Sequence, residues 1–272
     1  MRYRTLGRTG LRVGEVGMGT WQTFDARDSR GEAHVARLVE EALARGVNLF
    51  DTAPMYGESE RVLGLALRGR RERALVATKV LEYDPASARA SIERSFRLLQ
   101  TEVIDLMQVH NMAGWKALTP LLREYKDSGR VRFLGLTNYR PSMFPEMARA
   151  MRTGAYDAIQ IPFSLGEREA EREVLPLARE LGLGVLVMTP LCPMWDRQSL
   201  LRALGRADLS FLAPYGVRTP ARALLKYVLS NPDVSAVLPA TSKLEHLAEN
   251  VGASEGESLP LEVRRRLEKL LG

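Results

Sequence analysis

Hydrophobic positions along the chain alternate between two spacings, which predicts a repeating order of strand and helix. Short apolar runs rich in Val, Ile and Leu predict buried strands, and the longer segments between them carry the three-and-four spacing of amphipathic helices. One such helix is expected over 32–46, where Gly46 fits the stop, and another over 85–100, where Pro85 fits the first turn. The predicted strands are 13–19, 48–53, 74–80, 103–110, 133–138, 158–162, 184–191 and 234–241.

This order predicts an α/β fold, a single (β/α)8 TIM barrel. The chain has 272 residues, and such barrels are typically about 250 residues long. No Pro/Gly/Ser-rich linker divides the sequence, so we expect one domain over 1–272. Residues 2–13 predict an N-terminal hairpin that closes the bottom of the barrel. The long connection 192–218 predicts a loop over the mouth.

Charge and hydropathy narrow the classes of partner. The net charge is +6, but 39 basic residues are interleaved with 33 acidic ones, and the mixed-charge segment 166–182 is typical of a solvated helix face. We therefore expect no nucleic-acid partner, although the basic excess could favour an anionic cofactor. No apolar run has the length of a signal peptide or a membrane span. The expectation is a cytoplasmic monomer that does not bind membranes.

Cysteine and histidine usage predicts no metal site. Cys192 is the single cysteine, which excludes an intramolecular disulfide and a multi-cysteine metal centre. The three histidines, His34, His110 and His246, lie in separate segments without metal-ligand spacing. Cys192 lies close to the predicted mouth, where it is either oxidation-sensitive or inert packing.

Four polar residues lie where predicted strands end: Asp51, Tyr56, Lys79 and His110. The carboxyl ends of barrel strands face one mouth, so these side chains are expected to converge. A phenol with a pKa of about 10 is a weak acid near neutrality, and an adjacent ammonium can lower that value by roughly 1–3 units. Lys79 would supply this charge, Asp51 would hold Lys79, and His110 would orient the proton acceptor. The four residues together predict a proton-donating active site.

Each residue alone also has a structural explanation. Asp51 could cap the next helix, because Asp is a favoured N-cap. Lys79 could be a solvated residue at the end of a strand, and His110 a hydrogen-bonded structural histidine. Their common placement at one mouth is what favours the catalytic interpretation.

The chain resembles the aldo-keto reductases over essentially its whole length. The resemblance rests on one motif at each predicted strand, in order: GMGTW (17–21), DTAPMYG (51–57), TKV (78–80), DLMQVHN (105–111), GLTNY (135–139), AIQIPFS (158–164), MTPL (188–191) and LPATSKLEHLAEN (238–250). It implies carbonyl reduction with a nicotinamide cofactor bound across the mouth without a Rossmann glycine loop, and no GxGxxG follows any strand. By this resemblance Tyr56 protonates the carbonyl oxygen.

The same resemblance implies a set of cofactor-binding residues. Thr137, Asn138 and Gln160 match positions that bind the nicotinamide carboxamide, although each could instead cap a following helix. Lys243 could bind a 2′-phosphate even though Ala240 and His246 stand where many NADPH-preferring members carry lysine and arginine. NADPH is therefore the expected cofactor, with NADH not excluded. The remaining implied positions are Thr20, Met188, Pro190, Leu191, Thr241, Ser242, Glu249 and Asn250.

Substrate identity is weakly encoded. The resemblance places Trp21 on the substrate side together with Tyr56 and His110, and the alternative for Trp21 is packing at the barrel rim. The short loop after His110 predicts an open pocket for small or varied aldehydes and ketones. Aromatic and methionine side chains in loops at the same mouth could line that pocket or pin the loops: Tyr83, Trp115, Met194 and Trp195.

Two rival functions remain open from the sequence. In the first, Lys79 is the Schiff-base nucleophile of an aldolase-type lyase, since a desolvated lysine at a strand end suits that chemistry. In the second, the protein is an accessory module that senses the nicotinamide cofactor. No dedicated partner helix or tail supports the second interpretation.

Overall fold

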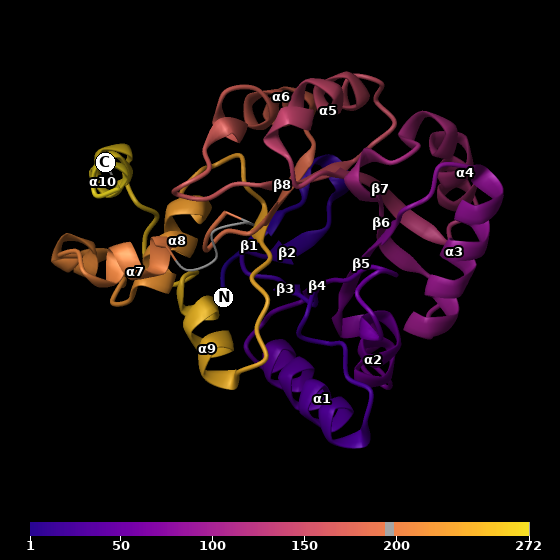
Figure 1. Ribbon diagram of the computed structural model, residues 1–272, viewed down its shortest axis with the longest axis horizontal. Helices are drawn as coiled ribbons and strands as arrows, with labels where there is room; N and C mark the ends of the chain where they lie inside the picture. Colours follow the sequence, from indigo (N-terminus) through magenta and orange to yellow (C-terminus); the bar gives the residue numbers. More distant parts are fainter. Residues whose placement is uncertain (194–198, 272) are drawn as a thin grey trace.

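Eight parallel strands form one curled sheet in the computed structural model, which describes residues 1–193 and 199–271 (Figure 1). The strand order is β10-β9-β8-β7-β6-β5-β4-β3. Parallel bridges from Val16 to Val237 and from Gly19 to Ala240 join the first and last strands. The predicted (β/α)8 barrel is confirmed. The strands are β3 (Met18–Gly19), β4 (Leu49–Asp51), β5 (Leu75–Val80), β6 (Ile104–Val109), β7 (Val131–Thr137), β8 (Ala158–Pro162), β9 (Gly184–Met188) and β10 (Ala236–Val237).

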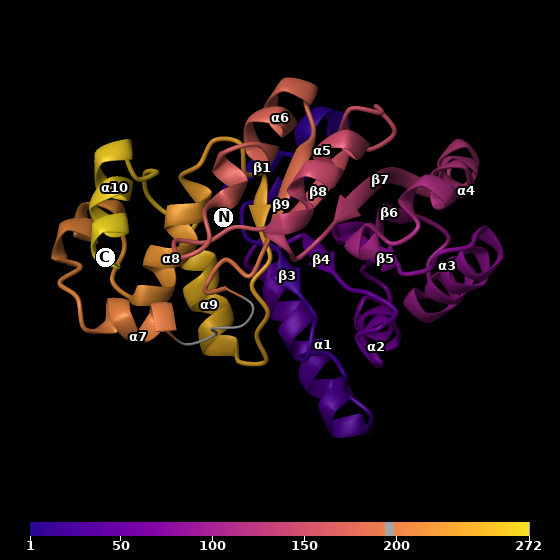
Figure 2. The ribbon, with the colours of Figure 1, turned by 45° about the horizontal axis from the view of Figure 1, so that its top comes forward.

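Helices surround the sheet in chain order: in Figure 1, α1 lies at the bottom, α2 to α4 on the right, α5 and α6 at the top, and α7 to α10 on the left. Figure 2 shows the same molecule turned by 45°. Two helices begin at aspartates whose side chains accept hydrogen bonds from backbone N–H groups: Asp28 for α1 and Asp84 for α3. The helices are α1 (Ser29–Ala44), α2 (Ser59–Ala66), α3 (Pro85–Leu99), α4 (Trp115–Asp127), α5 (Phe144–Met151), α6 (Val174–Leu181), α7 (Ser199–Gly205), α8 (Pro220–Leu229), α9 (Leu244–Gly252) and α10 (Leu261–Lys269).

The N-terminal hairpin closes the bottom of the barrel as expected. Strands β1 (Tyr3–Thr5) and β2 (Arg12–Gly14) pair in antiparallel fashion. Leu6, in the turn between them, is fully buried and belongs to the same apolar cluster as Leu106 and Leu186 inside the barrel. The backbone N–H of Arg8 donates to Gly182 O, at the start of the segment that leads into β9. The hairpin therefore seals the end of the barrel opposite the site.

Three predicted elements differ from the structure by more than a shift of their ends. The strand expected over 13–19 is divided: Val13 pairs within the hairpin, whereas Met18–Gly19 pairs with β4 and Val16 makes an isolated bridge to Val237. The strand expected over 234–241 is reduced to β10, since Pro239 has no N–H with which to extend the ladder. The segment 192–218 is not a simple loop: its described part contains α7 and a 3-10 helix, η6 (Ser210–Tyr215).

The barrel interior is layered, and this layering positions the site. One layer of small and branched apolar side chains includes Leu49, Ala77, Leu106, Ala158 and Leu186. Two residues further along each strand, side chains point to the same interior, one step closer to the mouth. Those positions are Asp51, Lys79, Gln108, Gln160 and Met188.

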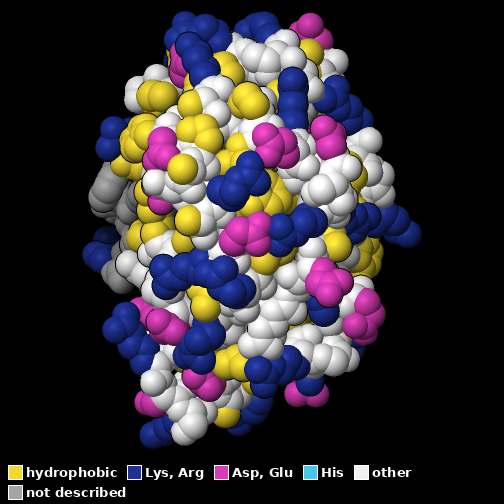
Figure 3. Space-filling model, turned by 90° about the vertical axis from the view of Figure 1, so that its right-hand side faces the viewer, with side chains coloured by type: hydrophobic (Ala, Val, Ile, Leu, Met, Phe, Trp, Pro, Cys, Tyr) yellow, Lys and Arg dark blue, Asp and Glu magenta, His cyan; other side chains and the backbone are white. Residues whose placement is uncertain are grey.

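The outer surface carries mixed charge on the face drawn in Figure 3, where Lys and Arg side chains are interspersed with Asp and Glu. Two ion pairs link α3 with α4 and the segment after it: Arg89 with Glu124, and Glu93 with Arg130. None of the helices in the described part of the chain is both long and apolar enough to cross a membrane.

Candidate active site

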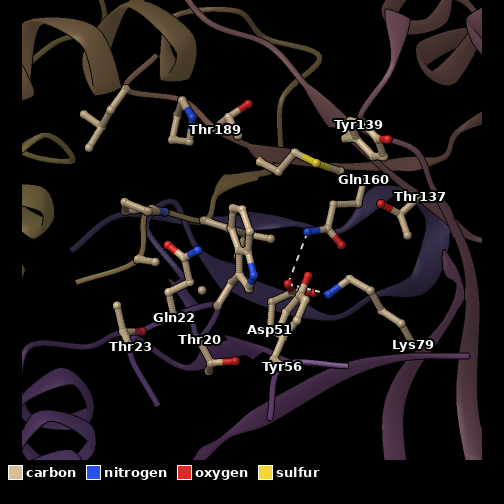
Figure 4. Close-up of a pocket in the computed structure, with 18 of the residues that line it drawn as sticks. Thr20, Gln22, Thr23, Asp51, Tyr56, Lys79, Thr137, Tyr139, Gln160 and Thr189 are labelled. Carbon is tan, nitrogen blue, oxygen red and sulfur yellow. Dashed lines mark hydrogen bonds and ion pairs between the residues drawn. The ribbon is translucent and has the colours of Figure 1, made fainter. Parts of the chain in front are cut away.

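A buried ion pair lies at the centre of the polar layer. Lys79, on β5, donates from Nζ to Asp51 Oδ2 over 2.7 Å and to the backbone oxygen of Thr52 over 2.8 Å (Figure 4). Lys79 is 1% exposed and Asp51 is 3% exposed. A charged pair this deep is stable only when its remaining polar atoms are also hydrogen-bonded. The neighbouring strands supply those hydrogen bonds.

Two glutamines complete the surroundings of the Asp51 carboxylate. Gln160, on β8, donates from Nε2 to Oδ2 over 3.2 Å, and Gln108, on β6, donates from Nε2 to Oδ1 over 3.2 Å. Gln160 is a predicted site residue. Gln108 was missed, and the signal that could have found it is a single amide in the otherwise apolar run LMQV before His110.

Tyr56 lies above this pair, in the loop between β4 and α2. Its ring centroid is 4.9 Å from Lys79 Nζ, 6.1 Å from the His110 ring and 6.4 Å from the Trp21 ring. The backbone N–H of Tyr56 donates to Ala53 O, which fixes the turn that carries the side chain. The structure therefore brings together the four residues that the sequence singled out, with Tyr56 between the ion pair and His110.

The pKa of Tyr56 corrects one expectation from the sequence. The pKa of Tyr56 is above its ordinary value, and burial is the largest cause. The Lys79 ammonium lowers this pKa, and the Asp51 carboxylate raises it. Lys79 therefore does favour the phenolate, but burial outweighs it. Burial also opposes the charge on Lys79, yet Asp51 and Tyr56 hold the pKa of Lys79 above its ordinary value. Lys79 is a cation and Tyr56 a protonated phenol near neutrality.

His110 is a neutral imidazole near pH 7. Burial, with a smaller contribution from the Lys79 charge, lowers the pKa of His110 to about 3. His110 begins the 3-10 helix η3 (His110–Met112), in which Asn111 and Met112 have φ of 53° and 60°. These left-handed residues turn the chain sharply at the end of β6 and leave the ring facing Tyr56 edge-on. A neutral His110 can donate one hydrogen bond without competing as an acid.

A cavity of about 570 Å³ opens from this layer to the mouth. Beyond the four central residues, the predicted residues that line it are Thr20, Trp21, Thr137, Gln160, Met188, Pro190, Leu191 and Ala240. The sequence did not single out several further lining residues, among them Gln22, Thr23, Met55, Asn111, Tyr139 and Thr189. Thr189 has φ of 51°, which is rare for a β-branched residue, and it lies at the end of β9.

The other predicted cofactor residues lie outside the lining. The Asn138 side chain donates to Asn111 O and accepts from Arg140 N. It therefore forms a local turn and does not cap the following helix, which was the alternative that the sequence offered. Ala240 leads from the cavity to the turn before α9, where Thr241 Oγ1 accepts from Lys243 N and His34 contacts Ser242 O over 2.6 Å. The rest of the predicted group is carried by that turn and by α9: Thr241, Ser242, Lys243, His246, Glu249 and Asn250.

Two of the loop residues considered for the substrate pocket, Tyr83 and Trp115, do not line the described cavity. Tyr83 is 77% exposed. Trp115 donates from its indole N–H to Glu146 over 3.0 Å and packs against the core. This hydrogen bond holds Trp115 between α4 and α5, which agrees with the second of the two roles that the sequence left open. Met194 and Trp195 lie outside the described residues. Over the described ranges, no group of three or more His, Cys, Asp or Glu residues could hold a metal ion.

The barrel, its hairpin and the Asp51–Lys79–Tyr56–His110 cluster at the carboxyl ends of the strands define a class of barrel oxidoreductases. The model of the aldo/keto reductase family matches residues 15–271, and the chain belongs to this family. It is 32% identical over 315 aligned residues to the uncharacterized oxidoreductase YrpG of Bacillus subtilis, with 98% of this chain and 95% of that protein covered. The prediction that the chain is an NAD(P)H-dependent oxidoreductase is confirmed at the level of the family.

Solved structures agree with this assignment. The holo form of the aldo-keto reductase AKR11C1 from Bacillus halodurans superimposes with a TM-score of 0.82 at 28% identity, covering 99% of this chain and 96% of the other. An aldo/keto reductase from Klebsiella pneumoniae, solved in complex with NADP and acetate, superimposes with a TM-score of 0.85 at 23% identity, with 99% and 95% covered. The second similarity supports the fold alone.

Proposed function

We propose that this protein reduces aldehydes or ketones to alcohols with NADPH, as one domain over residues 1–272, and that Tyr56 is the general acid. The observation that carries the proposal is the position of the Tyr56 ring, 4.9 Å from the Lys79 ammonium and 6.1 Å from His110 at the mouth of the barrel. A protonated phenol above a buried cation can release its proton to a developing alkoxide, because the cation stabilises the phenolate that remains.

The residues of the cavity fit a nicotinamide cofactor. Gln160 Oε1 and Thr137 Oγ1 are buried and have no hydrogen-bond partner among the described residues, although both side chains line the cavity. A carboxamide offers both donors and an acceptor, so it could satisfy an amide oxygen and a hydroxyl at adjacent strand ends. NADPH would supply the hydride when bound, and the side chains of β7 and β8 would hold its nicotinamide.

Each catalytic side chain would have its own task. Tyr56 would donate the proton to the carbonyl oxygen, and Lys79, held by Asp51, would stabilise the resulting phenolate. His110, neutral near pH 7 because burial holds its pKa at about 3, would donate a hydrogen bond that positions the same oxygen. Trp21, whose side chain is partly exposed beside Tyr56, would contact the rest of the substrate.

The choice of NADPH over NADH rests on Lys243. This residue is exposed in the turn that continues from the cavity through Ala240, and its ammonium is a point charge suited to a phosphate group. The Schiff-base alternative is disfavoured by the same ion pair that favours reduction. A nucleophilic lysine must be neutral, whereas Lys79 donates to Asp51 and to Thr52 O and has a raised pKa.

The test combines cofactor binding with turnover in the purified protein. Fluorescence titration with NADPH and NADH would be followed, in the same sample, by addition of a small aldehyde and measurement of cofactor oxidation. We expect tighter binding of NADPH and oxidation that depends on the aldehyde. Tyr56→Phe should bind NADPH as the wild type does while turnover falls by roughly 10²–10⁴-fold, the range for loss of a general acid.

Two outcomes would overturn the proposal. Tight NADPH binding without reduction of any carbonyl in a broad panel would favour the cofactor-sensing function instead. An unchanged rate in Tyr56→Phe would remove Tyr56 from the mechanism.

A further inference from the structure

One buried side chain beside Asp51 is not among the catalytic and cofactor-binding residues described above. Gln108 is 0% exposed on β6 and donates from Nε2 to Asp51 Oδ1 over 3.2 Å. Among the described residues it makes the one side-chain hydrogen bond to Oδ1, whereas Oδ2 receives Lys79 and Gln160. The two oxygens of the same carboxylate are therefore held by different groups.

The register of the sheet explains why Gln108 reaches Asp51. Gln108 pairs with Lys79 on β5 and with Gly135 on β7, so all three positions face the barrel interior in one layer. In parallel strands, residues in register lie side by side on the same face. The amide of Gln108 thus lies in the layer that holds the Asp51–Lys79 pair.

Gly135 makes the space that Gln108 occupies. A Cβ atom built on Gly135 would lie 2.9 Å from Gln108 Cγ and 3.3 Å from Leu106 Cδ1. Gly135 is not among the residues with positive φ, so its backbone does not require glycine. The missing side chain instead gives the long Gln108 side chain room to turn toward Asp51.

The buried amide of Gln108 has a cost that an apolar side chain would avoid. Gln108 Oε1 is buried and has no partner among the residues that the structure describes. A buried acceptor without a hydrogen bond destabilises the folded protein. A methionine or leucine would fill the same interior position without that cost, so the donor that faces Asp51 is the useful part of the side chain.

We propose that Gln108 is a positioning residue for carbonyl reduction: by holding Oδ1, it fixes the rotation of the Asp51 carboxylate so that Oδ2 alone contacts Lys79 and the ammonium stays close to Tyr56. This inference rests on the proposed function. Without Gln108, the free Oδ1 would turn toward the nearest donor, Lys79, and draw its ammonium toward Asp51 and away from the phenol. The Lys79 ammonium lowers the pKa of Tyr56, so its displacement from the phenol would make Tyr56 a weaker acid.

Other titratable groups near this arrangement are few. Tyr56 and His110 face the pair from the mouth, and Glu60, on α2, interacts with Lys79 from outside the barrel. Gln108 itself does not titrate. A change in the pH dependence of the rate on replacing it therefore reports on the titratable groups around it.

The first experiment replaces Gln108 with methionine, which has a similar length and no donor. Gln108→Met should lower kcat by up to about 10²-fold, as expected for a displaced catalytic group. The KM for the carbonyl and the Kd for NADPH should change by less than about threefold, because Gln108 does not line the described cavity. Equal kcat in Gln108→Met and wild type would overturn the proposal, as would a loss of NADPH binding as large as the loss of kcat.

Gly135→Ala is the matched steric variant, in which Gln108 remains but is displaced by the added methyl group. It should also lower kcat. In the double variant with Gln108→Met, the alanine should cost less activity than it costs in the wild type, because the hydrogen bond it disturbs is already lost. Additive losses would contradict the proposal. Gly135→Ala also gives an answer if Gln108→Met fails to fold.

The pH dependence of the rate in a conservative variant distinguishes a positioning role from a purely structural one. In Gln108→Glu, the introduced carboxyl can donate to Asp51 only while it is protonated, and two adjacent carboxyl groups share a proton with a raised pKa. The rate should therefore be close to wild type at low pH and fall as pH rises, with a limb that the wild type lacks. A pH profile parallel to that of the wild type would count against Gln108 as a positioning residue.

A crystal structure of Gln108→Met separates this proposal from the proposed function. The expected result is an Asp51 carboxylate that contacts Lys79 through both oxygens, with Lys79 Nζ further from Tyr56 than in the wild type. Unchanged Asp51–Lys79 geometry would overturn the positioning role even in a protein with no measurable turnover. Absence of NADPH-dependent reduction in the wild type would instead refute the proposed function.

Discussion

Lys79 Nζ donates to Asp51 Oδ2 over 2.7 Å and lies 4.9 Å from the centroid of the Tyr56 ring. The ammonium therefore interacts with a carboxylate that holds it and with a phenol that it makes more acidic. Lys79 and Asp51 are buried and Tyr56 is half-buried, so these interactions are little screened by solvent or salt. Stability and catalysis depend on the same charge.

Lys79→Met should lower both turnover and stability. Turnover should fall by at least about 10²-fold, because Tyr56 loses the charge that stabilises its phenolate. The free energy of unfolding should fall by about 3–5 kcal/mol, since Asp51 is left as an unpaired buried charge. Urea unfolding and steady-state rates measure the two effects.

The double variant Lys79→Met/Asp51→Asn distinguishes the two consequences. It should regain much of the lost stability, because no buried charge is left unpaired, but it should not regain turnover. Recovery of turnover in the double variant, or wild-type turnover in Lys79→Met, would contradict this account of Lys79.

His110→Gln should make the protein less sensitive to acid. The pKa of His110 is about 3 in the folded protein, whereas an unfolded histidine has a pKa of about 6.5. Between these values the unfolded chain binds more protons, so wild-type stability falls as pH is lowered through about 6.5, by at most about 1.4 kcal/mol per pH unit. His110→Gln removes this loss.

Urea unfolding of wild type and His110→Gln at pH 7 and pH 5 measures the difference. His246 provides a matched control. Its imidazole is exposed in the folded protein, so its exposure to water changes little on unfolding. Equal pH dependence of stability in wild type and His110→Gln would refute the assignment of a low pKa to His110.

Glu60→Gln should stabilise the protein near pH 7. Glu60 is 1% exposed on α2, its Oε1 accepts from Thr78 Oγ1 over 2.6 Å, and burial raises its pKa. A carboxyl whose pKa is raised by folding favours the folded state below its unfolded pKa and loses that advantage as pH rises through the folded value. A neutral amide of the same shape keeps the hydrogen bond from Thr78 and removes the buried charge.

The expected gain for Glu60→Gln at pH 7 is on the order of 1 kcal/mol, the scale of one uncompensated buried polar group. It should disappear below about pH 4.5, which denaturant unfolding at pH 4 and pH 7 would detect. The exposed Glu262 serves as the control, and Glu262→Gln should show little effect. A Glu60→Gln protein less stable than wild type at pH 7 would contradict this prediction.

Lys243→Ala should weaken binding of NADPH but not of NADH. Loss of one charge-assisted contact to a 2′-phosphate should raise the Kd for NADPH about tenfold at low salt, and increasing salt should reduce the difference between variant and wild type. Fluorescence titration with both cofactors measures the effect. Lys269→Ala, an exposed lysine at the end of α10, should change neither affinity. Equal weakening for NADH and NADPH would place Lys243 away from the 2′-phosphate.

The sequence by itself determined the barrel and much of the candidate site. Alternating strand and helix spacing leads to one parallel sheet, and in that sheet residues at the ends of different strands must meet at one mouth. Asp51, Lys79 and His110 follow or end consecutive barrel strands, so their convergence with Tyr56 depends on the order of the elements rather than on details of packing. The confirmed hairpin is likewise local, since both of its strands lie within residues 3–14.

Only the tertiary structure decided how burial, neighbouring charges and packing affect the side chains of the site. Burial raises the pKa of Tyr56 even though the Lys79 charge lowers it. The extent of burial depends on segments that are far apart in the sequence. Gln108 reaches Asp51 because Gly135 leaves space beside it, a relationship between β6 and β7 that no local pattern encodes. The hydrogen bond from Trp115 on α4 to Glu146 on α5 likewise depends on how two separate helices pack. Spacing along the chain specifies which residues face inward, whereas contacts, desolvation and charge balance arise only when distant segments are packed together.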